Sequence, residues 1–294
     1  MNISMNRIKG ILYAAVSSST FGLAPFFSIT LLLAGFSAFE VLSYRWGVAA
    51  IVLTLFGWCS GCNFRLAKKD LLVVFLLSLL RATTSFSLLI AYQNIAVAST
   101  IHFMYPLAVS LAMMFFFHEK KSLLVMFAVL MSLFGAALLS SGELEAKSGD
   151  TIVGLVAACI SVFSYGGYII GVRTTRAAQI NSTVLTCYVM GMGAVLYLIG
   201  AMATFGLHLV TDGYIWLIIL GLALPATAIS NITLVRAIKY AGPTLTSILG
   251  AMEPLTAVVI GVFVFKELFT LNSAIGILLI LLAVGMVVFR KQKS

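Results

Sequence analysis

Charged residues are scarce in this chain of 294 residues: only 9% of the sequence is Asp, Glu, Lys or Arg, and 62% is hydrophobic. A soluble domain cannot bury that much apolar surface, because its own exterior must face water. The composition therefore excludes an ordinary soluble protein and indicates a chain that uses lipid as its solvent. In a soluble chain, the formal net charge of +9 would suggest a nucleic-acid partner. Here the basic residues lie in short segments between apolar runs, so membrane orientation explains them and no nucleic-acid partner is expected.

Cysteine is also scarce, and the four cysteines do not form the pattern of a disulfide framework. Cys59 and Cys62 have the spacing of a redox or metal-binding pair, but no second pair and no histidine lies near them in the sequence. Ordinary thiols are therefore expected. The chain has no P-loop, no G-x-S-x-G and no cluster of His and Cys. We expect no enzymatic activity, no cofactor and no metal.

Long apolar runs are what the sequence has in abundance. A helix needs about 20 mostly apolar residues to span a bilayer. Ten such runs occur, five on each side of a polar stretch at 142–150. The runs lie near 10–33, 38–58, 71–94, 97–117, 122–141, 152–171, 182–206, 213–236, 243–265 and 271–289.

Basic loop residues fall almost entirely on one side of this topology. With the N-terminus inside, the outer loops hold only Lys147 and Lys266. The cytoplasmic segments hold Arg7, Lys9, Arg65, Lys68, Lys69, Lys120, Lys121, Arg173, Arg176, Arg236, Lys239, Arg290, Lys291 and Lys293. This asymmetry follows the positive-inside rule. It predicts an all-α, multi-pass protein of the bacterial inner (plasma) membrane, with ten transmembrane helices and both termini in the cytoplasm.

The two halves of the chain repeat each other. A shift of 148 residues superposes Pro106 on Pro254 and Glu119 on Glu267, and it also superposes Tyr92 on Tyr240. A second shift, of 144 residues, matches Gly10, Gly22, Tyr44 and Gly47 with Gly154, Gly166, Tyr188 and Gly191.

Five spans in each half make the second repeat enter the membrane upside down. We therefore expect a first repeat at 1–141, a periplasmic linker at 142–151 and a second repeat at 152–294. Inverted repeats are a recurrent plan of transporters, in which the substrate binds near the midplane between the repeats. The alternative is a duplication retained only for stability.

Two further features carry a resemblance. Each half has an x-Pro helix followed by an apolar run that ends in Glu, and the second span contains Tyr44-Arg45-Trp46. With the ten spans, these features resemble the EamA-like members of the drug/metabolite transporter superfamily over nearly the whole chain. The resemblance implies spans one to four and six to nine around a central cavity, with five and ten outside. It also implies alternating access by rocking of the halves, and small metabolites that are frequently exported.

Arg81 and Glu253 are ionisable residues deep inside predicted spans. Arg81 lies about eleven residues from the cytoplasmic start of the third span and Glu253 about ten from that of the ninth. At ~1.5 Å per residue, both are roughly 15 Å deep, near the middle of a ~30 Å core. Their equal depth permits a structural salt bridge. Alternatively, one or both contact substrate charge or a proton, which is a frequent role of intramembrane charges.

The prolines of the fourth and ninth spans mark candidate cavity walls. Tyr105 and Glu253 each precede a proline, and a proline frees a carbonyl group and bends its helix. Pro106 and Pro254 are therefore candidates for shaping gates, although a simple packing kink is an equal alternative. His102 lies three residues before Tyr105 on the same helical face. It is either a hydrogen-bonded structural residue or a proton carrier.

Polar and aromatic residues at helical spacing on several spans support a central cavity. Serine and threonine in membrane helices also join neighbouring helices, so only the coincidence across spans is informative. The additional substrate-binding candidates are Tyr44, Ser85, Tyr165 and Asn231, and Pro25 is a third helix-shaping candidate. Arg45 lies about seven residues into the second span from the outer face. We expect it to snorkel outward; the alternative is a place at the outer mouth.

These features favour a secondary transporter that exports amino acids or related amphiphilic metabolites by alternating access. The expected partners are a small-molecule substrate, the lipid bilayer and possible coupling protons, and the chain is expected as a monomer or weak dimer. The alternatives are proton-coupled uptake or antiport of nucleotide-type solutes, or a non-transporting membrane receptor or channel.

Overall fold

The computed structural model describes residues 5–94, 98–119, 122–140, 150–204, 206–263 and 269–289, and no strand occurs in these ranges. The predicted linker 142–151, apart from its last two residues, lies outside the described residues, as does Glu267 of the repeat comparison. Of the basic loop residues used for the predicted topology, those outside the described ranges are Lys120, Lys121, Lys147, Lys266, Arg290, Lys291 and Lys293.

Seven helices are described in the first half of the chain. They are α1 (Met5–Phe21), α2 (Ala24–Leu33), α3 (Ala38–Cys59), α4 (Lys68–Asn94), α5 (Ala98–His102), α6 (Tyr105–Phe115) and α7 (Leu123–Ser140).

In the described ranges, the second half has another seven α-helices and three short segments of other helical type. The α-helices are α8 (Thr151–Thr174), α9 (Ser182–Thr204), α10 (Gly213–Ala223), α11 (Ser230–Ala241), α12 (Pro243–Leu249), α13 (Glu253–Phe263) and α14 (Leu271–Val288). The others are the 3₁₀ turns η2 (Arg176–Gln179) and η4 (Gly250–Met252), and the π-helical turn η3 (Leu224–Ile229).

The predicted spans are present as helices. Within the described ranges, nine helices are long and apolar enough to cross a membrane, some of them formed by two consecutive segments such as α1 and α2. The remaining predicted span, at 122–141, is the shorter apolar helix Leu123–Leu139.

Breaks divide three of the spans near their middle. Pro25, Pro106 and Pro254 are the second residues of α2, α6 and α13, where the segment after each break begins. Proline is tolerated in the first turn of a helix because the N–H that it lacks has no partner there. The break therefore lies just before each proline.

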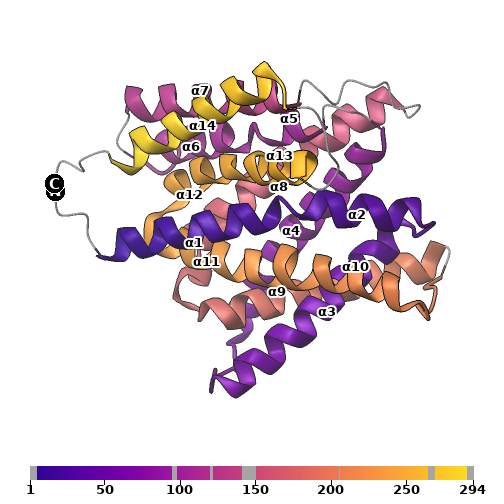
Figure 1. The fold of residues 1–294 in the computed structure, drawn as a ribbon. Coiled ribbons are helices and arrows are strands. Elements are labelled where there is room, and N and C mark those ends of the chain that lie inside the picture. Colours follow the sequence, from indigo (N-terminus) through magenta and orange to yellow (C-terminus); the bar gives the residue numbers. More distant parts are fainter. Residues whose placement is uncertain are drawn as a thin grey trace.

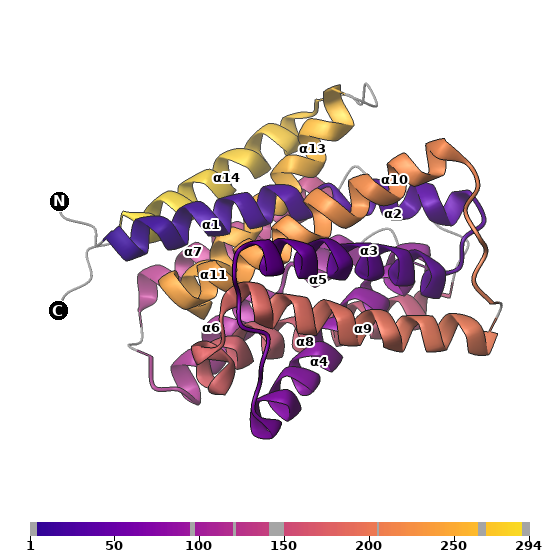
Figure 2. The ribbon, with the colours of Figure 1, turned by 90° about the horizontal axis from the view of Figure 1, so that it is seen from below.

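Helix packing repeats itself between the halves. The third span of the first half, α4, packs along α8, the first span of the second half, and α1 packs along α11 in the reciprocal way. The second spans, α3 and α9, pack on each other, as do the fifth spans, α7 and α14. Figures 1 and 2 show α7 and α14 together at one side of the bundle. Such reciprocal pairs are what an in-plane pseudo-twofold axis requires, so the chain has a two-repeat architecture.

Two glycines allow α7 and α14 to approach closely. A Cβ on Gly135 would lie 2.8 Å from the Gly276 carbonyl oxygen, and a Cβ on Gly276 would lie 2.7 Å from the Gly135 oxygen. Small residues at such contacts let membrane helices pack backbone to backbone. The contact is itself symmetric, since each glycine contacts the other.

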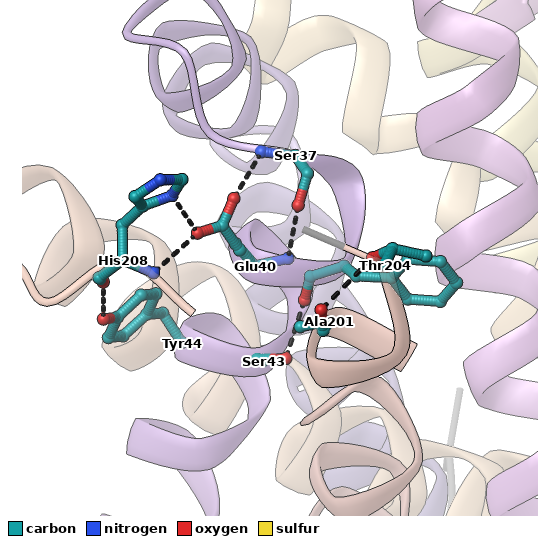
Figure 3. Close-up of polar contacts among 8 residues, drawn as sticks. Ser37, Glu40, Ser43, Tyr44, Ala201, Thr204 and His208 are labelled. Carbon is teal, nitrogen blue, oxygen red and sulfur yellow. Dashed lines mark hydrogen bonds and ion pairs between the residues drawn. The ribbon is translucent and has the colours of Figure 1, made fainter. Parts of the chain in front are cut away.

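A buried carboxylate fixes the N-terminal part of α3 to the connection between α9 and α10. Glu40 accepts hydrogen bonds from the backbone N–H of Ser37 (2.9 Å) and of His208 (2.8 Å), and it lies 2.6 Å from His208 Nδ1 (Figure 3). Its side chain is 1% exposed. The Tyr44 hydroxyl donates to the His208 carbonyl, also from α3. Residues far apart in the sequence are thereby joined at one end of the bundle.

Candidate functional site

A cavity of about 750 Å³ lies between the two halves. It reaches Leu33, which is 84% exposed, and Thr270, so it opens at the end of the bundle where α2 ends and α14 begins. We call this the Leu33 end, and the opposite end, where α1 begins, the Met5 end. The Arg7 guanidinium donates to the Val287 carbonyl (2.9 Å), so α14 also finishes at the Met5 end.

The charged residues of the cavity are confined to its deep part. The cavity floor consists of Phe21, Arg45, Arg81, His102, Tyr165 and Glu253. Phe21, Arg81, Tyr165 and Glu253 lie near the middle of their spans. The walls above it are largely apolar, with Phe26, Ile29, Leu88, Leu89, Phe103, Ala257, Val258, Ile260 and Val262 among their residues. Polar recognition at the floor is therefore combined with apolar burial above it.

Arg81 of α4 is held by two hydrogen bonds and two aromatic rings. Its Nε donates to Asn231 Oδ1 and its Nη1 to Ser85 Oγ, both at 3.1 Å. The guanidinium carbon lies 5.2 Å from the centre of the Phe21 ring and 5.1 Å from that of the Tyr165 ring. An aromatic face attracts a cation at this distance. Arg81 is 5% exposed, so the structure presents a fixed cation at the cavity floor.

Glu253 of α13 lines the same cavity but does not pair with Arg81. In the part of the chain that the structure describes, its carboxylate takes part in neither an ion pair nor a hydrogen bond, although it interacts electrostatically with Arg81 and Arg45. Gly22 allows the break between α1 and α2 to approach it, since a Cβ there would lie 2.6 Å from the Glu253 carbonyl oxygen. The carboxylate is therefore available to a ligand.

Three rings pack against one another at the cavity floor and just below it, with His102 stacked on Tyr165 and the Tyr105 ring edge-on to Tyr165. The ring centres of Tyr105 and Tyr165 are 4.6 Å apart, and each lies 5.4 Å from that of His102. The His102 Nδ1 atom is 2.9 Å from Ser161 Oγ, which itself donates to the Ala158 carbonyl. Tyr105 does not line the cavity: it is 1% exposed and lies on the Met5 side of the floor.

The expectation that Arg45 snorkels outward is wrong. Arg45 is 8% exposed and lines the cavity, with its Nε donating to Thr227 Oγ1 at 2.6 Å and its Nη2 to the Ala226 carbonyl at 3.3 Å. Both acceptors lie in η3, and the polar acceptors of this turn draw the side chain inward. Pro225 within the eighth apolar run was the sequence signal that could have located this turn, because proline interrupts helical hydrogen bonding.

The structure brings most of the other predicted site residues to the cavity or next to it. Ser85, Pro25 and Pro254 line it, and Asn231 supports Arg81 from behind. Pro106 lies beneath the floor in α6. Tyr44 is not brought there: its hydroxyl is bonded to His208, and its ring packs edge-on against those of Phe36 and Trp216.

Below the floor, the Met5 end is closed. Helix α6 packs on α12, and the Tyr105 side chain fills the space left by Gly250, where a Cβ would lie 1.6 Å from the tyrosine hydroxyl. Three buried polar atoms in this region lack a hydrogen-bond partner: Ser110 Oγ, Tyr168 Oη and Thr246 Oγ1. Such atoms normally find partners, because an unsatisfied buried group costs ~1–3 kcal/mol.

The described side chains provide no group of three His, Cys, Asp or Glu that could hold a metal ion. All four cysteines are free thiols, and Cys59 and Cys62 are at least partly exposed.

Comparison with known proteins identifies relatives of both repeats. Residues 8–141 and 152–289 each match the model of the EamA-like transporter family. A solved crystal structure superposes with a TM-score of 0.81 over 97% of each chain, at 18% sequence identity, and so has the same fold. No curated protein matches.

Proposed function

Because the chain belongs to the EamA-like transporter family, and is therefore a multi-pass membrane transporter of the drug/metabolite type, we propose that it exports amino acids or related small amphiphilic metabolites across the bacterial inner membrane by alternating access. The family consists of transporters, which is consistent with the expectation that the chain is not an enzyme.

The observation that carries this proposal is the composition of the cavity. Glu253 and Arg81 stand at its floor without pairing with each other, and the walls above are apolar. A volume of about 750 Å³ is in the usual range of pockets for small organic ligands. An amine at Glu253, an acidic group at Arg81 and an apolar body against the walls would together fill the site.

The direction in which the cavity faces follows from the predicted topology. The positive-inside rule places the Met5 end in the cytoplasm. On this proposal the cavity opens outward, in an outward-facing state whose cytoplasmic end is closed by Tyr105.

The ligand class is tested by thermal unfolding of the purified protein with amino acids, nucleotides, sugar phosphates and cationic drugs. A ligand that binds only the folded state raises the melting temperature by mass action. We expect leucine-like amino acids to stabilise the wild type. In Glu253→Gln their affinity should fall by about 10- to 100-fold, because a hydrogen bond to a charged group contributes ~1.5–3 kcal/mol.

The matched control is Asp70→Asn. Asp70 pairs with Arg176 at 2.6 Å on the surface, where ion pairs contribute little. The Asp70→Asn variant should bind the same ligands as the wild type. Stabilisation by nucleotides alone, or an unchanged amino-acid affinity in Glu253→Gln, would contradict the assignment.

The unpaired polar atoms at the Met5 end support alternating access. The pseudo-twofold axis relates each element of the cavity wall to an element at the Met5 end. It pairs α2 with the end of α8, the end of α4 with α11, α5 with α12 and α13 with α6. Ser110, Tyr168 and Thr246 lie in α6, α8 and α12. They are therefore placed where an inward-facing cavity would form, and water there would supply the missing hydrogen bonds.

Cysteine labelling tests this pathway. In a variant without native cysteines, Ser110→Cys and Thr246→Cys should react with a membrane-impermeant maleimide applied from the cytoplasmic side, and the rate should rise several-fold during substrate exchange. Ser132→Cys is the control, because Ser132 is equally buried (2% exposed) but lies in α7, which is not among the helices expected to line the inward-facing cavity. Protein that transports while both cysteines stay unlabelled would rule the pathway out.

A further inference from the structure

Arg45 and Arg81 are both anchored on one stretch of the eighth span. Arg45 donates to Thr227 Oγ1 and Arg81 to Asn231 Oδ1. Thr227 and Asn231 are four residues apart and are joined by a hydrogen bond from Asn231 Nδ2 to the Thr227 carbonyl (2.7 Å). Residues at this spacing share a helix face, with Cβ atoms about 5–6 Å apart. The two guanidinium groups are therefore anchored on two neighbouring side chains, and they interact electrostatically with each other.

The turn η3 makes the Arg45 anchor possible. A π-helical turn shifts the backbone hydrogen bonds out of their usual register, and Pro225 within it has no N–H to donate. Thr227 Oγ1 donates to the Leu222 carbonyl (2.7 Å), which leaves its lone pairs free to accept from Arg45. The local irregularity of the eighth span thus fixes the guanidinium of the second.

Each guanidinium keeps unused donors. Over the described residues, Arg45 Nη1 and Arg81 Nη2 have no protein acceptor, whereas the other nitrogens of the two groups are bonded. Both side chains are more than nine-tenths buried and both line the cavity. Charged groups removed from water require a partner of opposite charge.

The fixed charge at the floor is unbalanced. Among the described residues that line the cavity, Glu253 is the one carboxylate, against two guanidinium groups. It interacts electrostatically with both, and the two guanidinium groups also repel each other. A further anion between them would remove this repulsion.

We propose that Arg45 and Arg81 form a paired-guanidinium site that binds one acidic group of the transported solute, a carboxylate or a phosphate. The inference rests on the proposed function, in that the cavity is taken as the substrate site. Planar guanidinium groups offer paired donors that match both acids. Recognition then requires the acidic group. Once bound, this group bridges Arg45 of the second span and Arg81 of the third, both of which are anchored on the eighth.

Ligands that share one apolar body test the site: leucine, N-acetylleucine, leucinamide and isopentyl phosphate, measured by thermal stabilisation of the full-length protein. Leucine and N-acetylleucine keep the carboxylate, leucinamide lacks it, and isopentyl phosphate replaces it. We expect leucinamide to bind at least about 10-fold more weakly than leucine. Preference between leucine and isopentyl phosphate identifies the acid as carboxylate or phosphate.

Variants assign the effect to Arg45. In Arg45→Gln, the affinities for the acidic ligands should fall about 10- to 100-fold and that for leucinamide should stay unchanged. Arg45→Lys keeps the charge but loses the paired donors, so it should be intermediate. The control Arg176→Gln, at an exposed arginine, should match the wild type. Thr227→Val leaves the charge in place and should also reduce affinity for the acidic ligands.

Two results would overturn the paired site while leaving the transporter proposal standing: leucinamide binding as tightly as leucine, or Arg45→Gln weakening all ligands equally. If none of the four ligands stabilises the wild type, both the proposed substrate class and the paired site fail.

Discussion

Replacing Arg81 with alanine is expected to abolish transport and to lower the affinity for acidic ligands by about 100-fold or more. The substitution removes two hydrogen bonds, to Asn231 and Ser85, and a cation held between the Phe21 and Tyr165 rings. It also leaves Glu253 with Arg45 as the remaining guanidinium at the floor. A charged hydrogen bond in a buried site contributes ~1.5–3 kcal/mol, so the loss of one bond to the ligand alone accounts for tenfold or more.

The measurements are ligand-induced thermal stabilisation and exchange of labelled solute in proteoliposomes. Arg81→Lys should retain part of the activity, because lysine keeps the charge but neither the planar donors nor the stacking. The control Arg236→Ala removes an arginine that packs on Tyr13, away from the cavity lining, and should transport normally. If Arg81→Ala unfolds like the wild type and still binds acidic ligands normally, Arg81 has only a structural role.

Gly250→Ala is expected to force open the Met5 end. The new Cβ would lie 1.6 Å from the Tyr105 hydroxyl oxygen and 2.8 Å from Cζ. Tyr105 has little room to move, because it is 1% exposed and packs against Tyr165 and His102. Overpacking a buried site costs ~1–3 kcal/mol. The state described here, closed at the Met5 end, should therefore lose stability by this amount relative to a state that is open at that end.

This loss should appear as faster labelling of Ser110→Cys from the cytoplasmic side and as a lower melting temperature without ligand. Adding Tyr105→Phe to Gly250→Ala should reverse part of the effect, because it removes the atom at 1.6 Å and leaves the one at 2.8 Å. Gly285→Ala is the matched control, since a Cβ there meets nothing within 4 Å. Equal effects of the two alanine substitutions would show that the contact with Tyr105 is not responsible.

Much of the fold could be predicted because lipid imposes simple rules on sequence. Hydropathy located the spans, and the prolines at 25, 106 and 254 mark where three of them break. The depth of a residue follows from counting along a span, and Arg81 and Glu253, placed at equal depth by counting, line one cavity. Their separation could not be counted, because it depends on how helices from the two halves are rotated against each other.

Arg45 shows the limit of reasoning from depth. Its distance from the outer face permitted either snorkelling or an inward orientation, and the choice was decided by acceptors on a different helix, in the turn η3. Tyr44, one residue earlier, points to the loop at His208 instead of the cavity. Adjacent residues on a helix face directions about 100° apart, so the side that faces the cavity had to come from the packed structure.

The Glu40 anchor is expected to hold one side of the cavity mouth in place. Glu40 ties α3 to the connection between α9 and α10 (Figure 3), and α2 packs on α10, with Phe27 against Gly221. These helices form one connected group along one side of the opening. The opposite side, built from α5 and α13, lacks such a tie among the described residues. The movement that narrows the mouth around a bound solute is therefore expected from α5 and α13, against the side that Glu40 holds in place.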